Sequence, residues 1–199
     1  MNATKRICLL AVLTATLTGG KTALALIPNI EIVTLLFIVY AFVFGWRNTI
    51  IVSVVFVVIE IFIWGFNLWW VILYLIYWPL LVTAAAVLPR KLGNGRLVAA
   101  IAFGIAFTVF FGVLSTFIEI IFMGGVGSGF FWQFFGWRDI AGIPFFTAHI
   151  VSNAIILPVL VPVLYKTLQK LRMAEKINGR QKIQKPVKPA PPAAEEKLA

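Results

Sequence analysis

The sequence predicts an all-α integral membrane protein, a compact bundle of six transmembrane helices with both termini in the cytoplasm. Of its 199 residues, 61% are hydrophobic and only 12% are charged, whereas a soluble domain carries about 25% charged residues. Apolar runs that approach the length of a bilayer-crossing helix, about 20 residues, follow one another from residue 7 to residue 165 with brief polar breaks. A transmembrane bundle is therefore the expected fold.

Six apolar runs are separated by residues that end helices. We expect the transmembrane helices at residues 7–27, 31–45, 49–64, 69–88, 97–123 and 141–165. The breaks between them hold turn-forming residues, namely Pro28 and Asn29, Gly45 to Asn48, Gly65 to Asn67, Pro89 to Arg96, and Gly124 to Gly129. Because each break is short, neighbouring helices should run antiparallel.

The basic residues predict which helix ends face the cytoplasm. With the N-terminus inside, every Lys and Arg falls on the cytoplasmic side except Lys21, within the first span, and Arg138. This distribution is a strong positive-inside bias. The net charge of +10 would suggest nucleic acid for a soluble protein, but here the bases lie between the aromatic-rich runs. Binders of single strands mix the two along one groove, so we expect no nucleic-acid partner.

Composition divides the chain into a membrane domain and a tail. Residues 1–172 form the transmembrane domain, and residues 173–199 are rich in Lys, Pro, Ala and Gln without apolar periodicity. Such a segment is expected to be a disordered cytoplasmic tail that contacts anionic lipid headgroups. At the other end, Lys5 and Arg6 before an apolar run that ends in Ala23-Leu24-Ala25 imitate a signal peptide. Cleavage there would leave five spans.

The residues that usually carry covalent or metal chemistry are scarce. Cys8 is the only cysteine and His149 the only histidine, so the chain alone forms neither a disulfide nor a thiolate metal cluster, and a zinc peptidase site is not expected. Gly20-Lys21-Thr22 resembles the end of a nucleotide-binding loop, but Ala15 stands where that pattern needs glycine. We expect no metal, no cofactor and no catalytic residues, and any ATP would be hydrolysed by a partner.

Ionisable residues within the predicted spans concentrate on one side of the membrane. Glu31, Glu60 and Glu119 lie at outer ends of spans, Asp139 lies just outside the sixth span, and His149 follows two turns into it. Inside a bilayer such groups usually face a bundle interior or a watery cavity. They favour a site that opens to the outside and accepts a polar or cationic solute. The alternative is that these side chains reach the lipid headgroups.

Further polar and aromatic side chains accompany these groups. His149 and Asn153 share one helical face one turn apart, where they either bind a ligand or form hydrogen bonds between helices. Tyr74 and Trp78 of the fourth span lie too deep to be interfacial anchors. They either stack on a flat heteroaromatic ring or a cation, or pack against other helices. Trp132 belongs to an aromatic outer segment expected to cover the cavity or to lie in the membrane interface.

A resemblance to a known family is carried by the segment ALALIPNIEIVTLLFIVYAFVFGWRN. It resembles the substrate-binding S components of energy-coupling factor (ECF) transporters, in which a Pro-Asn turn, a Val-Thr pair and a small-plus-basic turn often follow in order. The matching residues are Pro28, Asn29, Val33, Thr34, Gly45 and Arg47. The segments WWVILYLIYWPLL and FFTAHIVSNAIILP look similar to the same family. The resemblance covers about residues 7 to 165, and its strength lies in the order of the motifs.

The resemblance implies a subunit that captures a vitamin or related small metabolite outside a prokaryotic plasma membrane. Its implied partners are a transmembrane T component and two ATPase subunits. Ala11 and Ala15 fit the Ala-x-x-x-Ala pattern that meets the T component. By position, the implied substrate-binding residues are Tyr74, Trp78, Glu119, Trp132, Asp139, His149 and Asn153. Lys21 departs from the family pattern, and its side chain should reach water or an acid such as Glu31 or Glu119.

Two other functions fit parts of the sequence. A stand-alone proton-coupled secondary transporter would use Glu60, Glu119 and His149 as proton relays, although many such proteins contain two repeated bundles and no repeat is evident here. An intramembrane protease would pair Ser128 with His149. Ser128 lies in a glycine-rich outer loop, whereas such a nucleophile is expected inside a helix beside its base.

Overall fold

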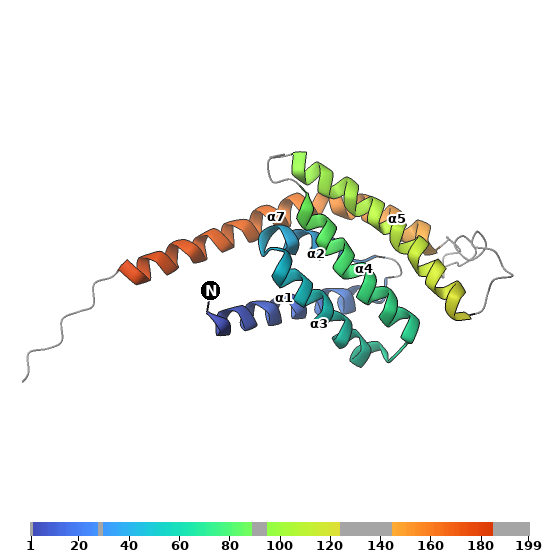
Figure 1. The fold of residues 1–199 in the computed structure, drawn as a ribbon. Helices are drawn as coiled ribbons and strands as arrows, with labels where there is room; N and C mark the ends of the chain where they lie inside the picture. The colour runs from blue at the N-terminus through green and yellow to red at the C-terminus, as the bar shows by residue number, and fades with distance from the viewer. Residues whose placement is uncertain (1, 28–29, 89–94, 124–144, 185–199) are drawn as a thin grey trace, which may run out of the picture.

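The computed structural model describes residues 2–27, 30–88, 95–123 and 145–184, and within these ranges the chain forms six helices and no strands. The helices are α1 (Ala3–Leu24), α2 (Val33–Val43), α3 (Trp46–Trp64), α4 (Leu68–Val87), α5 (Gly95–Met123) and α7 (Phe145–Gln184) (Figure 1). The predicted all-α class is confirmed for these residues.

Five of these helices, α1, α3, α4, α5 and α7, are long and apolar enough to cross a membrane. Their outer surfaces expose large hydrophobic side chains, including Phe62, which is 84% exposed, and Phe117 and Ile155. Apolar area left in water costs about 25 cal/mol per Å², whereas hydrocarbon solvates the same surface without this cost. Length, composition and surface together indicate a multi-pass membrane protein.

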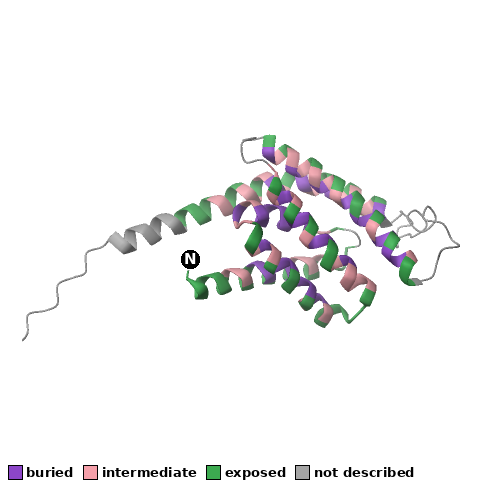
Figure 2. Ribbon diagram, in the orientation of Figure 1, coloured by how far each residue is buried: buried purple, intermediate pink, exposed green. Residues whose placement is uncertain are grey.

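Helix α2 differs from the others because it is short and enclosed. Its 11 residues extend about 16 Å at 1.5 Å per residue, roughly half of the 30 Å hydrocarbon core. All of them except Phe42 are buried, and α2 contacts each of the other five helices. Figure 2 shows its buried residues in the middle of the bundle. Its largely apolar sequence thus reflects burial by protein, and a six-span topology stays a prediction.

Two glycines make the tight connections on either side of α3. Gly45 and Gly65 have φ angles of 85° and 87°, a region that glycine adopts without the steric cost that a side chain would bring. Gly45 separates α2 from α3, and Gly65 begins the short turn to α4. The breaks predicted at these positions are confirmed.

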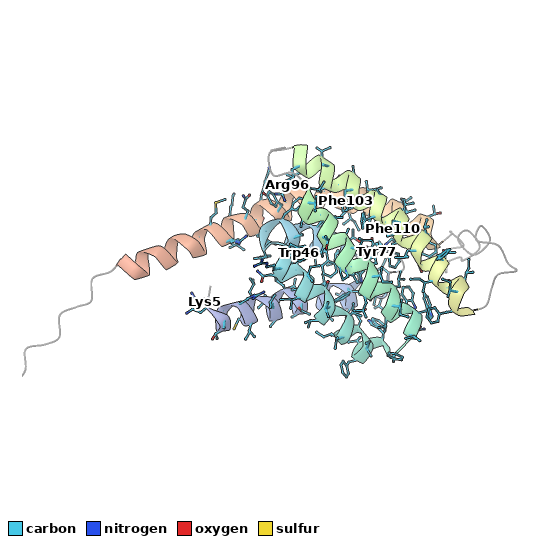
Figure 3. The ribbon with its side chains drawn as sticks, viewed as in Figure 1. Lys5, Trp46, Tyr77, Arg96, Phe103 and Phe110 are labelled. Carbon is cyan, nitrogen blue, oxygen red and sulfur yellow. The ribbon has the colours of Figure 1, made fainter. Side chains whose placement is uncertain are left out.

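Helix α5 packs closely against α2 and α7 at Gly104. A Cβ atom added there would lie 2.6 Å from Cδ1 of Leu157 and 2.9 Å from Cδ1 of Ile38. Nearby, Tyr77 of α4 reaches α5 and donates its hydroxyl hydrogen to the carbonyl oxygen of Phe107 at 2.9 Å (Figure 3). These contacts hold the polar side chains of α5 and α7 next to the start of α2.

The end of α7 corrects one expectation. Residues 173–199 were expected to be disordered, but α7 continues to Gln184 and extends beyond the other helices (Figure 1). Lys, Arg, Gln, Ala and Met are good helix formers, and a helix already nucleated within the bundle propagates at little cost. Composition suggested a loose tail because it ignores this continuity. The rest of the predicted tail lies outside the described residues.

Candidate functional site

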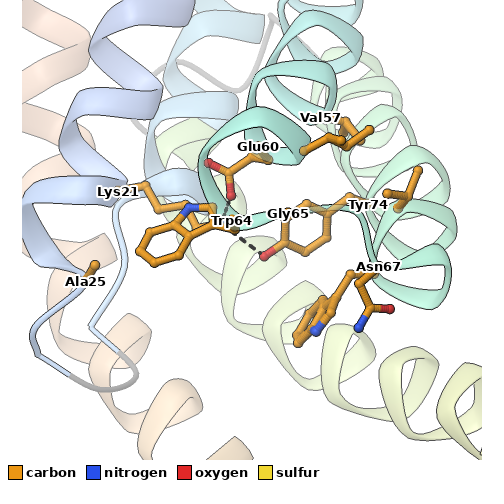
Figure 4. Close-up of a pocket in the computed structure, with 11 residues that line it drawn as sticks. Lys21, Ala25, Val57, Glu60, Trp64, Gly65, Asn67 and Tyr74 are labelled. Carbon is orange, nitrogen blue, oxygen red and sulfur yellow. Dashed lines mark hydrogen bonds and ion pairs between the residues drawn. The ribbon is translucent and has the colours of Figure 1, made fainter.

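Two neighbouring hollows open at the end of the bundle opposite the start of α1. The first, here called the α3 hollow, has a volume of about 480 Å³ and is bounded by α1, α3, α4 and the turn between α3 and α4 (Figure 4). The second, called the α7 hollow, has a volume of about 290 Å³ and extends between α1, the segment before α2, α4, α5 and α7. Both are lined by Lys21, Ala25, Trp70 and Tyr74.

An ion pair inside the bundle forms part of the α3 hollow. The ammonium of Lys21 pairs with Oε2 of Glu60 and donates to the hydroxyl of Tyr74 at 3.3 Å. It also lies 5.0 Å from the ring centre of Tyr74 and 5.6 Å from that of Phe56. The expected partners Glu31 and Glu119 are therefore wrong for this contact. Helices α1 and α3 pack together, which places Lys21 beside Glu60, whereas sequence spacing alone does not show that packing.

Two buried polar atoms at the hollows lack a hydrogen-bond partner among the described residues. They are Oε1 of Glu60, in the α3 hollow, and the indole Nε1 of Trp78, which lines the α7 hollow. A buried polar atom without a partner costs about 1–3 kcal/mol, more if it is charged. One acceptor and one donor beside the hollows are thus left without a partner within the described residues.

Glu31 is the centre of a second polar cluster, beside the α7 hollow. Its Oε1 accepts the hydroxyl hydrogen of Thr34 at 2.6 Å and an amide hydrogen of Asn153 at 3.2 Å. Its Oε2 accepts the backbone N–H of Val33 at 3.2 Å. Nε2 of His149 lies 3.4 Å from Oε1. The carboxylate of Glu31 therefore accepts hydrogen bonds from several donors, whereas that of Glu60 has one partner, Lys21, among the described residues.

Asn153 connects three parts of the bundle. It is 0% exposed, and the same amide nitrogen that reaches Glu31 also donates to Oγ1 of Thr108 on α5 at 3.0 Å. Thr108 in turn donates to the carbonyl oxygen of Gly104 at 2.9 Å. The sequence left two roles open for Asn153, namely binding a ligand or forming hydrogen bonds between helices. In the structure its amide forms hydrogen bonds between segments of the bundle. His149 instead stacks on Phe111, with ring centres 5.7 Å apart, and lines the α7 hollow.

Aromatic rings form one wall of both hollows. The ring centre of Tyr74 lies 5.5 Å from that of Trp70 and 5.5 Å from that of Trp78, and Phe111 continues the wall 6.3 Å beyond Trp78. Such faces favour flat rings and cations. An apolar wall with a few convergent polar groups is typical of small-molecule sites.

The residues expected at the site occupy different places. Tyr74 lines both hollows, Trp78 and His149 line the α7 hollow, and Asn153 lies behind it. Glu119 is buried on α5 but lines neither hollow. Trp132, Asp139 and the alternative nucleophile Ser128 lie outside the described residues. Ala11 and Ala15 are exposed on α1.

Several lining residues were not among the substrate-binding residues that the family resemblance implies. They are Lys21, Glu31, Glu60, Trp70 and Phe111. The three charged ones carried a signal, since an ionised side chain in an apolar span points to a partner or a cavity. Trp70 lies at the end of an apolar span, where a tryptophan is usually an interfacial anchor, and Phe111 is one phenylalanine among 18 in the chain. Within the described residues, no three His, Cys, Asp or Glu side chains gather as a metal site would need.

Comparison with protein-family models, with curated proteins and with solved structures finds no match. The resemblance to ECF S components therefore stays a prediction from the motifs, and the function is argued below from the geometry of the hollows.

Proposed function

We propose that this protein is the substrate-capturing membrane subunit of an ATP-driven ECF-type importer for a vitamin or related small metabolite. The observation that carries this proposal is the pair of aromatic-walled hollows containing Lys21, Glu60, Glu31 and His149. Their volumes, about 480 and 290 Å³, suit a small solute, since ligand sites commonly measure about 300–1,000 Å³.

The proposed orientation places both termini in the cytoplasm of a prokaryotic cell. Lys5, Arg6, Arg47 and Arg96 lie towards the end of the bundle remote from the hollows, as their positions at the starts of α1, α3 and α5 require. Basic residues concentrate on the cytoplasmic side of membrane proteins. The hollows then face the outside, where a capture subunit must meet its solute.

The proposed subunit binds and releases its solute without covalent chemistry. A transmembrane T component and two ATPases supply the energy. Ala11 and Ala15 are exposed and one turn apart on α1, a spacing that allows a second helix to approach closely. These two residues are the proposed contact with the T component.

The experiment that tests capture is a titration of the purified protein in detergent with a panel of vitamins, followed by tryptophan fluorescence. Trp70 and Trp78 line the hollows, so a bound solute should quench them. We expect saturable quenching by one compound at sub-micromolar concentration, weakened by His149→Ala. Trp46→Phe, at the opposite end of α3, serves as the control and should leave the affinity unchanged. A panel without any binder would contradict capture of a vitamin.

A second candidate function is a proton-coupled secondary transporter. It is favoured by the Lys21–Glu60 ion pair and by the contact of His149 with Glu31, because ionisable pairs in membrane proteins often mark proton or ion pathways. This function requires transport by the protein alone, driven by a proton gradient and independent of ATP. The importer subunit requires its ATPase partners for any accumulation.

A further inference from the structure

The α3 hollow carries a more specific inference, which rests on the capture function proposed above. We propose that it selects a planar, nitrogen-containing aromatic solute that presents an N–H donor edge, neutral or cationic, to Glu60, and that it discriminates against anions of similar size. Three features support this selectivity. They are the unpartnered oxygen of Glu60, the pairing of the Lys21 charge with Glu60, and the aromatic wall.

Glu60 offers an acceptor that nothing in the described part of the chain fills. Its side chain is 7% exposed, its Oε2 pairs with Lys21, and its buried Oε1 has no hydrogen-bond partner there. An ionised carboxylate accepts hydrogen bonds and donates none. A solute that adds an N–H donor satisfies this oxygen, whereas a second carboxylate places two acceptors against each other.

Lys21 is the nearest cation, but its charge is already used. Its ammonium group contacts Glu60 and the Tyr74 hydroxyl and lies over two aromatic rings. The other charged groups lining the two hollows are Glu31 and His149. When His149 is neutral, the two hollows together carry one positive charge, on Lys21, and two negative charges, on Glu31 and Glu60. When His149 is protonated, the positive and negative charges are equal in number. Neither state leaves excess positive charge for an anion, so Lys21 acts as a positioning residue for Glu60.

The wall of the hollow suits a flat solute. Trp70 and Tyr74 line it with their ring centres 5.5 Å apart, and Asn67 adds an amide that can both donate and accept. Aromatic faces attract planar rings, and cations most strongly when these are shielded from water. A volume of about 480 Å³ accommodates one or two fused rings.

Three probes of one shape test the charge preference. Benzamidine is a planar cation with paired N–H donors, benzamide is its neutral analogue, and benzoate is its anion. Each is titrated against the full chain in detergent, with tryptophan fluorescence as the readout. We expect benzamidine to bind roughly 10-fold or more tightly than benzoate, with benzamide between them, because a hydrogen bond to a charged group contributes about that factor.

Matched variants locate the effect. Glu60→Gln should weaken benzamidine binding by roughly 10-fold or more, whereas Trp46→Phe, at the opposite end of α3, should not. Because Glu60→Gln also leaves Lys21 unpaired, the double variant Lys21→Met/Glu60→Gln provides a second test. It removes both charges and should show the same loss of benzamidine affinity in a folded protein, as checked by thermal unfolding.

The opposite selectivity would overturn the inference. Benzoate binding more tightly than benzamidine, and losing that affinity in Lys21→Met but not in Glu60→Gln, would make Lys21 the recognition group while leaving capture intact. Failure of all three probes alongside binding of a panel vitamin would also refute the donor-edge preference and spare capture. Failure of both the probes and the vitamins would count against the capture function itself.

Discussion

Lys21 of α1 and Glu60 of α3, 39 positions apart in the chain, form an ion pair inside the bundle. The backbone of α1 packs against α2 and α3, and Lys21 also donates to the Tyr74 hydroxyl of α4, so these contacts link the end of α1 to the rest of the bundle.

Removal of the lysine charge should destabilise the protein more than removal of both charges. Lys21→Met leaves Glu60 buried without its cation, and breaking such a pair costs about 3–5 kcal/mol when it is well buried. Lys21 is partly exposed, so we expect the lower end of that range. The double variant Lys21→Met/Glu60→Gln should recover most of the loss in thermal unfolding. Equal instability of the single and double variants would show that the ion pair does not carry the effect.

The close crossing at Gly104 should tolerate no side chain. Gly104→Ala places a Cβ atom against Leu157 and Ile38, and overpacking of this kind costs about 1–3 kcal/mol. Gly19→Ala is the matched control, because nothing lies within 4 Å of its added Cβ, and alanine is the better helix former by up to about 1 kcal/mol. The two variants should shift the unfolding temperature in opposite directions. A stabilised Gly104→Ala would mean that α5 is free to move away from α7.

Asn153 should matter for stability through its links to Glu31 and Thr108. Asn153→Ala removes one hydrogen bond to the charged Glu31 and one to Thr108, at an expected cost of about 1–3 kcal/mol, while both partners keep their other hydrogen bonds. Thr167→Val provides the control, because Thr167 is exposed and bonds only to the carbonyl oxygen of Val163 in its own helix. Such surface changes stay within about 0.5 kcal/mol. An equal effect of the two changes in denaturation experiments would refute the structural role of Asn153.

Orientation can be tested with single cysteines in a Cys8→Ser background. Asn67→Cys lies between α3 and α4 at the mouth of the α3 hollow, and Arg47→Cys lies at the other end of α3. A membrane-impermeant maleimide added to intact cells should label position 67 and spare position 47. Inverted vesicles should give the reverse pattern. Labelling at position 47 in intact cells would place the hollows in the cytoplasm.

The sequence predicts the helices well because their signals are local. Runs of apolar residues and the glycines at 45 and 65 give most helix boundaries to within a few residues, the end of α7 at Gln184 being the exception, and five of the six predicted spans are helices long and apolar enough to cross a membrane. The role of α2 was not predictable from hydropathy, since an apolar run enclosed by protein reads like one exposed to lipid. The structure shows that α2 is enclosed by protein, because it has only 11 residues and contacts each of the other described helices.

The site was harder to predict because it depends on packing between distant segments. Intramembrane charge pointed to Glu31, Glu60 and Lys21, but nothing local to Lys21 indicates that Glu60 lies opposite. Asn153 was correctly placed on the face of His149, yet its partners Thr108 and Glu31 come from elsewhere in the chain. Residue type showed which groups needed partners, and only the fold shows which partners they have.

The most direct test of the central claim is transport by the purified protein alone in proteoliposomes, with the radiolabelled compound that the vitamin titration identifies. The account predicts saturable binding at the outward face without accumulation inside, with or without an imposed proton gradient. Glu60→Gln should reduce this binding, whereas Trp46→Phe should leave it unchanged. Concentrative uptake by the isolated protein, driven by the proton gradient, would contradict the capture-subunit account and establish a secondary transporter.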